Sequence, residues 1–239
     1  MALVAPASVS AATETSGGLL ETATGSTSGP TAGDVVSLVP ERLVETRSGP
    51  GDVTTDGAFQ GIGRVVAGGV VEFGVLGRGG VPGSGVGAVV LNVTAVGPSG
   101  AGHLTVFPCG DVPVASSLNY TAGSVVANEV VAKVSGSGTV CVRSHAETDL
   151  VVDVTGYVAS GAGVVSLVPE RLVETRSGPG DVTTDGAFQG VGRVVAGGVV
   201  EFGVLGRGGV PGSGVGAVVL NVTAVGPVHG RPSHSPPID

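Results

Sequence analysis

Charge, aromatic side chains and sulfur are all scarce in this chain of 239 residues. It contains no tryptophan, two tyrosines, five phenylalanines, two cysteines and a single lysine, Lys133. Nucleic-acid binding requires a basic surface that displaces phosphate counterions, and a net charge of -8 with no basic run excludes that partner. No apolar run approaches the roughly 20 residues that a membrane-spanning helix needs, so we expect no transmembrane segment.

Familiar enzyme motifs are also missing. The sequence has no G-x-S-x-G, no H-E-x-x-H and no G-x-x-x-x-G-K-[ST]. The glycine-rich residues 77–87 do not fit G-x-G-x-x-G, and no helical pattern follows them to supply an N-terminal dipole for a phosphate, so we interpret them as a turn. We therefore predict that the protein is not an enzyme and needs no cofactor.

Valine and glycine are abundant instead. The chain has 45 glycines and 15 prolines, yet 41% of its residues are apolar and only 13% are charged, whereas disordered chains are polar and charged. Most apolar residues are valines in short runs divided by Gly, Pro and Ser, which is typical of short strands joined by tight turns. The composition predicts an all-β protein.

A long internal repeat organises the chain. Residues 35–98 recur as residues 164–227 at a period of 129, with a single substitution between the copies. A repeat of this length is a domain rather than a solenoid unit. We expect a complete repeat at residues 35–158, a linker at 159–163 and the N-terminal half of a second repeat at 164–227.

The two ends of the chain differ from the repeats. Residues 1–12 end in small residues like a signal-peptide cleavage region, and we interpret them as a remnant of one, with a simple Ala-rich tail as the alternative. Residues 13–34 are rich in Gly, Ser and Thr, which predicts a flexible linker. Residues 228–239 form an aberrant tail, and codons exist for them that, read one base later, agree with residues 99–106 at seven of eight positions. Our hypothesis is a frameshift or contig end near residue 227, and the alternative is that the tail is real.

Short strands are expected throughout the complete repeat. They cover residues 35–40, 42–47, 70–76, 88–96, 103–107, 125–134, 139–143 and 150–158, with a break at Pro40. In residues 88–96 strict alternation places Val89, Leu91, Val93 and Ala95 on one face. With no helical pattern among these runs, we predict an antiparallel β-sandwich of jelly-roll type, and a closed barrel is the alternative.

The two cysteines, Cys109 and Cys141, both lie in the complete repeat. In a secreted protein such a pair predicts a disulfide, and two separate buried thiols are the alternative. Closing this loop stabilises the fold by roughly 3–4 kcal/mol on the entropy model. Neither cysteine sits in a C-x-x-C pair, and His103 and His145 have no second ligand at metal spacing, so we predict no metal site.

Three carboxylates are candidates for chemistry. Glu45 and Arg47 share a strand face and could form a catalytic carboxylate with its clamp, but we interpret them as a structural ion pair at a sheet edge. Asp52 and Asp56, the latter followed by Gly57, could ligate calcium. Their loop lacks the alternating acidic spacing of a dedicated calcium site, so we do not assign one.

Asparagines recur at N-x-T sequences. Asn92 and Asn221 are expected in the middle of strands, where a glycan would collide with the sheet, so we interpret them as structural polar residues. We expect Asn119, in the third such sequence, and Asn128 to serve turns or buried hydrogen bonds.

Several motifs occur in a distinctive order: R-L-V-E-T-R, L-N-V-T, G-H-L-T-V-F-P-C-G, V-A-N and D-V-T-G-Y. This order resembles a tandem all-β repeat of secreted proteins from actinobacteria and other soil bacteria. The first motif usually reads D-T-R in that family, and Glu45 takes the place of the aspartate here. The resemblance implies an extracellular all-β module, found in arrays or attached to secreted hydrolases, with no agreed activity.

These observations favour a non-catalytic secreted or cell-surface structural or adhesion module that serves as a stalk or spacer. The alternative is an accessory module of an exported hydrolase that binds carbohydrate or cell wall. Its ligand-contacting aromatic side chains would be Phe59, Phe107, Tyr120 and Tyr157. We also expect the half repeat at 164–227 to self-associate, because half a sandwich exposes an unpaired edge and an apolar face.

Overall fold

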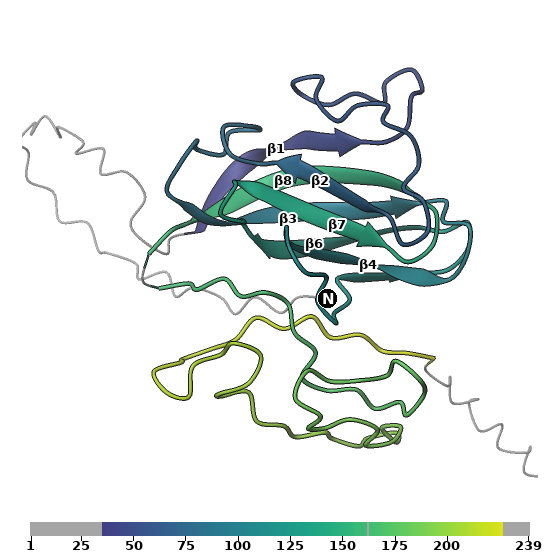
Figure 1. Ribbon diagram of the computed structural model, residues 1–239, viewed down its shortest axis with the longest axis vertical. Helices are drawn as coiled ribbons and strands as arrows, with labels where there is room; N and C mark the ends of the chain where they lie inside the picture. Colours follow the sequence, from purple (N-terminus) through teal and green to yellow (C-terminus); the bar gives the residue numbers. More distant parts are fainter. Residues whose placement is uncertain (1–34, 162, 227–239) are drawn as a thin grey trace, which may run out of the picture.

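The computed structural model describes residues 35–161 and 163–226, and every regular element within them is a β-strand (Figure 1). The eight strands are β1 (Val35–Glu45), β2 (Val70–Gly74), β3 (Val86–Val96), β4 (Gly102–Pro108), β5 (Leu118–Tyr120), β6 (Val125–Lys133), β7 (Thr139–Ser144) and β8 (Asp149–Ala159). In this part of the chain no helix has the length and apolar character to cross a membrane. The predictions on residues 1–34 and 228–239 lie outside the described residues.

The strands form two four-stranded antiparallel sheets, in the orders β1-β8-β3-β6 and β2-β7-β4-β5. The chain passes from one sheet to the other at every connection except that between β4 and β5. Side chains from both sheets fill one core, including Leu91 and Val152 of the first sheet and Phe73 and Leu104 of the second. The two sheets confirm the predicted all-β fold with antiparallel pairing and are consistent with a β-sandwich.

Alternation along β3 shows how the sequence builds this core. Val89, Leu91, Val93 and Ala95 are all fully buried, as their spacing predicts, while the residues between them are only half-buried. Each such valine or leucine contributes on the order of 1.5–3 kcal/mol when it leaves water. β3 lies between β8 and β6, so it is an inner strand with a hydrogen-bonded neighbour on each side.

Two details of the strands differ from the prediction. Pro40 does not break the first strand, because the register of β1 against β8 shifts between Ser37 and Glu41 and leaves proline in the irregular segment, where its missing N–H removes no ladder bond. β1 is also an edge strand, which tolerates proline. The three-residue β5 was not predicted, since Leu118 and Tyr120 are too short a pattern to recognise in sequence.

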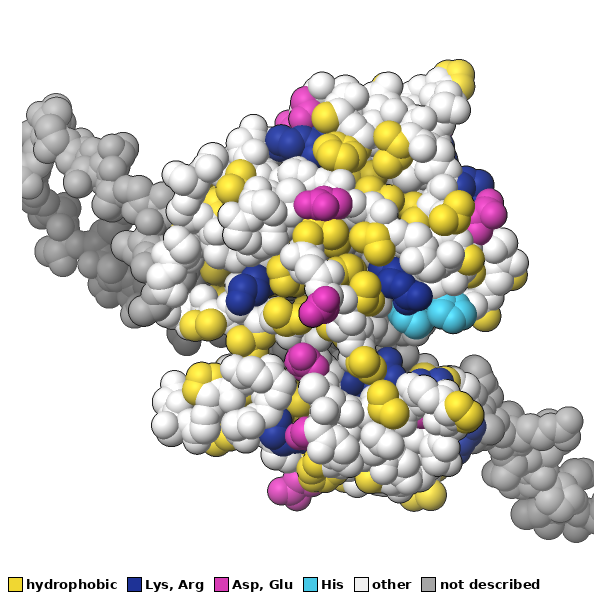
Figure 2. Space-filling view, in the orientation of Figure 1, with side chains coloured by type: hydrophobic (Ala, Val, Ile, Leu, Met, Phe, Trp, Pro, Cys, Tyr) yellow, Lys and Arg dark blue, Asp and Glu magenta, His cyan; other side chains and the backbone are white. Residues whose placement is uncertain are grey.

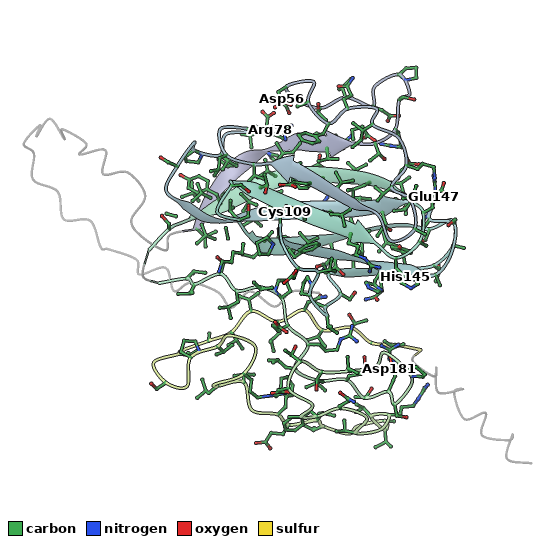
Figure 3. All side chains as sticks on the ribbon, viewed as in Figure 1. Asp56, Arg78, Cys109, His145, Glu147 and Asp181 are labelled. Atoms are coloured by element: carbon green, nitrogen blue, oxygen red, sulfur yellow. A yellow bond between two sulfur atoms is a disulfide. The ribbon has the colours of Figure 1, made fainter. Side chains whose placement is uncertain are left out.

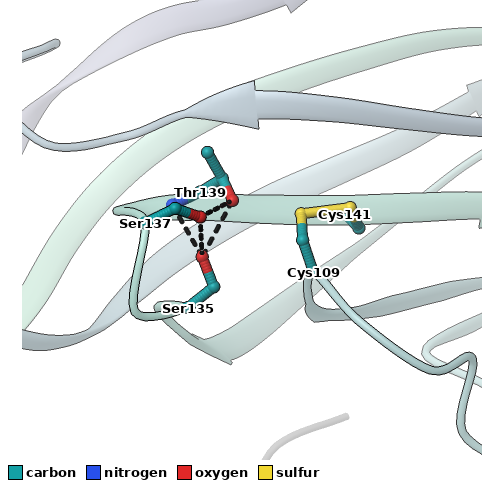
Figure 4. Close-up of a disulfide and its surroundings, with 5 residues drawn as sticks. All are labelled: Cys109, Ser135, Ser137, Thr139 and Cys141. Carbon is teal, nitrogen blue, oxygen red and sulfur yellow. Dashed lines mark hydrogen bonds between the residues drawn. A yellow bond between two sulfur atoms is a disulfide. The ribbon is translucent and has the colours of Figure 1, made fainter.

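The predicted disulfide between Cys109 and Cys141 is present, with a Cα–Cα distance of 5.0 Å. Cys141 lies on β7 and Cys109 directly follows β4, and these two strands are paired neighbours (Figure 4). Beside the disulfide, the turn from β6 to β7 is closed by hydroxyl contacts among Ser135, Ser137 and Thr139. The crosslink therefore fixes two strands of the same sheet to each other.

Residues 164–226 form no strand, although they repeat residues 35–97 almost without change. In the first copy β1 pairs with β8, β2 with β7, and β3 with β6 and β8, and none of the three pairs with another. All the partner strands lie between residues 99 and 159, which occur once in the chain. The consequence is visible at Val222, which is 83% exposed, whereas the corresponding Val93 is fully buried.

Candidate functional site

The most deeply buried charged group among the described residues is the carboxylate of Glu45, at the end of β1. Its side chain is fully buried and accepts four hydrogen bonds: from Arg42 Nη1 at 3.0 Å, and from the Arg47 backbone N, Nε and Nη2 at 3.1, 2.8 and 2.7 Å. An ionised carboxylate has about four lone-pair sites, so none is left for another partner. The backbone of Glu45 also bonds Phe59 and Gly61, which attaches the following loop to the strand.

The charges extend on both sides of this carboxylate. Arg42 Nε also bonds Asp153 Oδ1 on β8 at 2.9 Å, and Arg47 Nη2 lies 3.2 Å from Asp52 Oδ1. Burial on its own would raise the pKa of the Glu45 carboxyl group, but the hydrogen bonds from Arg47 and the charges of both arginines hold that pKa below its ordinary value. A general base needs a pKa near the working pH and a free lone pair, and Glu45 has neither.

The second clamp joins Asp56 to Arg78. Arg78 donates from Nε and Nη2 to the two Asp56 carboxylate oxygens at 2.6 and 2.9 Å, and it donates to the carbonyl oxygens of Gly74 and Leu43 (Figure 3). Its guanidinium lies 5.2 Å from the ring centroid of Phe59. The hydrogen bond from Arg78 lowers the pKa of Asp56 to about 2. Since Asp56 binds Arg78 and Asp52 lies against Arg47, neither carboxylate is free to ligate calcium.

The same clamps recur in residues 164–226. Arg207 binds Asp185 and lies 5.2 Å from the ring centroid of Phe188, while Glu174 accepts from Arg176 Nη2 at 2.7 Å. Phe59 and Phe188 even share a positive φ, of 55° and 54°. These loop clamps therefore form from local sequence and do not need the sheets around them.

A third clamp, formed by Arg64, lies at one end of the sandwich. Arg64 donates from Nε to Glu147 at 2.8 Å, from Nη1 to Asp149 at 2.6 Å and from Nη2 to the Gly97 carbonyl oxygen at 2.7 Å. All three partners are distant in sequence, so no spacing rule could have found them. Each of the three arginine clamps holds a loop against a strand end, which is a structural role.

The four aromatic residues predicted to contact a ligand do not form a binding surface. Phe107, Tyr120 and Tyr157 are buried, with exposures of 1%, 5% and 7%. The Tyr120 hydroxyl lies 2.8 Å from Ser144 Oγ, which satisfies its polar end inside the fold. Only Phe59 is partly exposed, and Arg78 covers its ring. In a core built mainly from valines, the few large rings are needed as filling, which corrects the prediction.

One pair that the sequence did not reveal consists of His103 on β4 and His145 after β7. Their ring centroids lie 5.3 Å apart at an interplanar angle of 29°, because the backbone N of His145 donates to the His103 carbonyl oxygen. Burial lowers the pKa of His103, and the neighbouring His145 lowers it further. Figure 2 shows histidine side chains beside basic ones on the face viewed. Only the pairing of β4 with β7 places the two residues together.

A cavity of 810 Å³ lies between the sandwich and residues 164–226. Asn119 Nδ2 donates to Thr223 Oγ1 at 3.1 Å across it, and Asn221 donates to the Ser116 carbonyl oxygen. The lining also includes charged and titratable side chains, namely His103, Arg143, Arg171, Arg176 and Asp181. Asn221 is not in the middle of a strand as predicted, because the strand that corresponds to β3 does not form in this copy.

The other two asparagines lie within the first sheet. Asn92 is in the middle of β3, opposite Glu129 of β6 and Asp153 of β8. Asn128 donates from Nδ2 to the Ser117 carbonyl oxygen at 2.7 Å, which joins β6 to the segment before β5. The positions of Asn92 and Asn128 are consistent with a structural role.

Among the described residues, one cluster has metal-ligating atoms close together: Glu72, Cys109 and Cys141, within 4.8 Å of one another. The two sulfur atoms form the disulfide, and metal binding to cysteine requires a thiolate. This cluster therefore cannot serve as a metal site while the disulfide is intact.

No protein-family model, curated protein or solved structure matches this chain.

Proposed function

We propose that the protein is a non-catalytic structural or adhesion module, a stalk or spacer at the outside of a cell. The observation that carries this proposal is the saturation of the Glu45 carboxylate by four hydrogen bonds. The clamp of Asp56 and Arg78 has the same character. The best-connected charged groups thus hold loops in place and are not available for proton transfer.

The architecture and the disulfide support the same proposal. The sheet orders β1-β8-β3-β6 and β2-β7-β4-β5 are those expected of two interlocked Greek keys, so we propose a jelly-roll unit with residues 164–226 as part of a second copy. The disulfide between Cys109 and Cys141 is typical of an oxidising compartment, which supports an extracellular location. The motif order resembles that of secreted bacterial repeats and supports the same assignment.

A carbohydrate- or cell-wall-binding accessory module is the second candidate, and one observation favours it. The 810 Å³ cavity has polar lining residues, including Thr105, Ser116 and Asn119, together with Arg143. Such groups suit a polar ligand, and the one aromatic residue in the lining, Tyr120, is only 5% exposed. Any ligand of this site would depend on hydrogen bonds and charge.

A sedimentation assay with the full chain separates the two candidates. The protein is incubated with insoluble peptidoglycan, cellulose and chitin, and both the pelleted protein and the released sugar are measured. A stalk or spacer stays in solution and releases no sugar. Retention that is lost on replacing the lining residues Arg143 and His103 by Ala, but not in the matched surface variant Val39→Ser, would establish the second candidate. Sugar release would overturn the non-catalytic assignment.

A further inference from the structure

Residues 99–159 have two nearly identical partners within this chain. The strands β4 to β8 lie in this segment, and β1, β2 and β3 of residues 35–98 pair only with them. Residues 164–226 repeat 35–97 with one difference, Val191 in place of Ile62. Ile62 is 49% exposed, so this difference does not alter the core. The second copy therefore carries every pairing and packing side chain of the first.

The connection between residues 159 and 163 makes this exchange sterically simple. In the antiparallel pair of β1 and β8, Val35 lies opposite Val158, so β1 begins where β8 ends. Val164 is the repeat of Val35, and five residues separate it from Val158. Loops of about four or five residues are common connections between antiparallel neighbours. A hairpin from β8 into residues 164–174 would thus reproduce the pairing of β1 with β8.

The released half would leave from the surface of the sandwich. In the exchanged arrangement residues 35–98 remain attached only through the connection between β3 and β4. That connection includes the exposed residues Ser99 and Ala101. Residues 35–98 can therefore leave the sandwich at this connection without crossing the core.

We propose that the apolar side chains left bare in residues 164–226 form a docking surface for residues 99–159 of the same chain. Docking replaces residues 35–98 and gives a circularly permuted sandwich with the same strand pairs. The surface is visible in the exposure of Leu220, 45%, and Val222, 83%, whereas the corresponding Leu91 and Val93 of the first copy are fully buried. Identical contacts in both arrangements mean that the chain connections, not the core, decide which one is populated.

The test uses the full chain and a matched pair of substitutions. Leu91→Asp places a charge in the core formed with residues 35–98, and Leu220→Asp makes the same change in the repeat. The proposal requires both single variants to unfold in one cooperative transition as monomers, and the double variant to show none. A Leu91→Asp variant without a cooperative transition would overturn it. Folding of that variant only as a dimer or larger species would overturn it too, by assigning the docking to a second copy.

Hydrogen–deuterium exchange then identifies which copy is in the sandwich. The substitution itself gives the two otherwise identical peptides different masses. In Leu91→Asp, amide protection is expected to move from residues 88–96 to residues 217–225, and in Leu220→Asp it should stay at 88–96. Protection that persists at 88–96 in Leu91→Asp, or that is lost from both segments, would contradict the exchange. If the core simply tolerated the charge at position 91, amide protection would stay at residues 88–96. This measurement therefore distinguishes a tolerant core from docking of the second copy.

Discussion

At the scale of single residues, arginine–carboxylate clamps dominate the loops of this protein. Glu45 is the extreme case, since its four acceptor sites are filled by Arg42 and Arg47. The proximity of Glu45 to Arg47 was predictable because residues i and i+2 of an extended segment lie on the same face, although β1 itself ends at Glu45. The pair of Asp56 and Arg78 was not, because 22 residues separate its members and only the folded loop joins them.

The first prediction concerns this buried carboxylate. Replacing both Glu45 and its repeat Glu174 by Gln removes the negative charge but keeps the size of the side chain. It leaves Arg47 without its main partner, while Arg42 keeps Asp153. We expect a loss of about 2 kcal/mol in the free energy of unfolding, because a buried charge pair is broken while the arginines stay partly solvated. Urea unfolding at neutral pH measures it. Glu174→Gln alone is the control and should change the transition little.

The second prediction concerns pH. The pKa of Asp56 is lowered from 3.8 to about 2 by Arg78, so the folded state resists protonation of this group more than the unfolded chain does. The stabilisation is complete above the unfolded value and is lost as the pH falls from about 4 towards 2. With Asp56 and Asp185 both replaced by Asn, stability should decline less steeply over this interval. An unchanged slope of unfolding free energy against pH would contradict the clamp.

At the scale of the strands, the alternation of apolar residues and the Gly, Pro and Ser residues at the turns were enough to predict where most strands lie. The buried face of β3 could be predicted because successive side chains point to opposite faces in every β-strand, whichever strands it pairs with. The path of β1 through Pro40 could not, because it depends on a register shift against β8, 111 residues away along the chain at Arg42 and Asp153. The pairing of β4 with β7 similarly determines the histidine pair, which no local pattern encodes.

The third prediction tests the crosslink between β4 and β7. Replacing Cys109 and Cys141 by Ser should lower the free energy of unfolding by about 3 kcal/mol, because the unfolded chain regains the entropy of the open loop. Chemical unfolding of the variant and of the wild type, with and without reductant, measures the difference. The variant should not respond to reductant. Equal stability of wild type and variant would show that the disulfide contributes nothing.

A fourth prediction tests the core through β4. Leu104→Ala removes a fully buried side chain from a segment that occurs once in the chain, and we expect a loss of about 3 kcal/mol from lost burial and the cavity that remains. Val125→Ala, at a position that is 69% exposed, is the control and should change stability by less than about 0.5 kcal/mol. Thermal unfolding compares the two. Similar effects at both positions would contradict the assigned core.

At the scale of the whole molecule, identical sequence has two structural outcomes. Residues 35–97 contribute three strands to the sandwich, and their repeat at 164–226 contributes none. The sequence alone showed the repeat and predicted that the second copy would lack a partner for its strands. It could not show that the loop clamps persist there, because that depends on how much of each loop is held by local contacts.

The fifth prediction uses this internal comparison. Trypsin should cut after the arginines of the second copy before it cuts after those of the first, because a backbone without sheet hydrogen bonds opens at little cost. The sites to compare are Arg171, Arg176, Arg193 and Arg207 against Arg42, Arg47, Arg64 and Arg78. Mass spectrometry of short digests orders the cuts. The peptides 43–47 and 65–78 are identical to 172–176 and 194–207, so the copies are compared through peptides that contain Ile62 or Val191 or that extend beyond the repeat. Equal rates of cleavage in the two copies would contradict the claim that residues 99–159 pair preferentially with residues 35–98.

The adjacency of Val35 and Val158 also determines how the unit responds to force. Tension applied to the two ends of an antiparallel pair at their neighbouring termini loads the cross-strand hydrogen bonds one after another, since these bonds lie perpendicular to the strands. β1 and β8 would peel apart at low force. The covalent loop closed by Cys109 and Cys141 would stay closed while the rest of the unit extends. A stalk of such units would lengthen in steps under load and keep a locked segment in each.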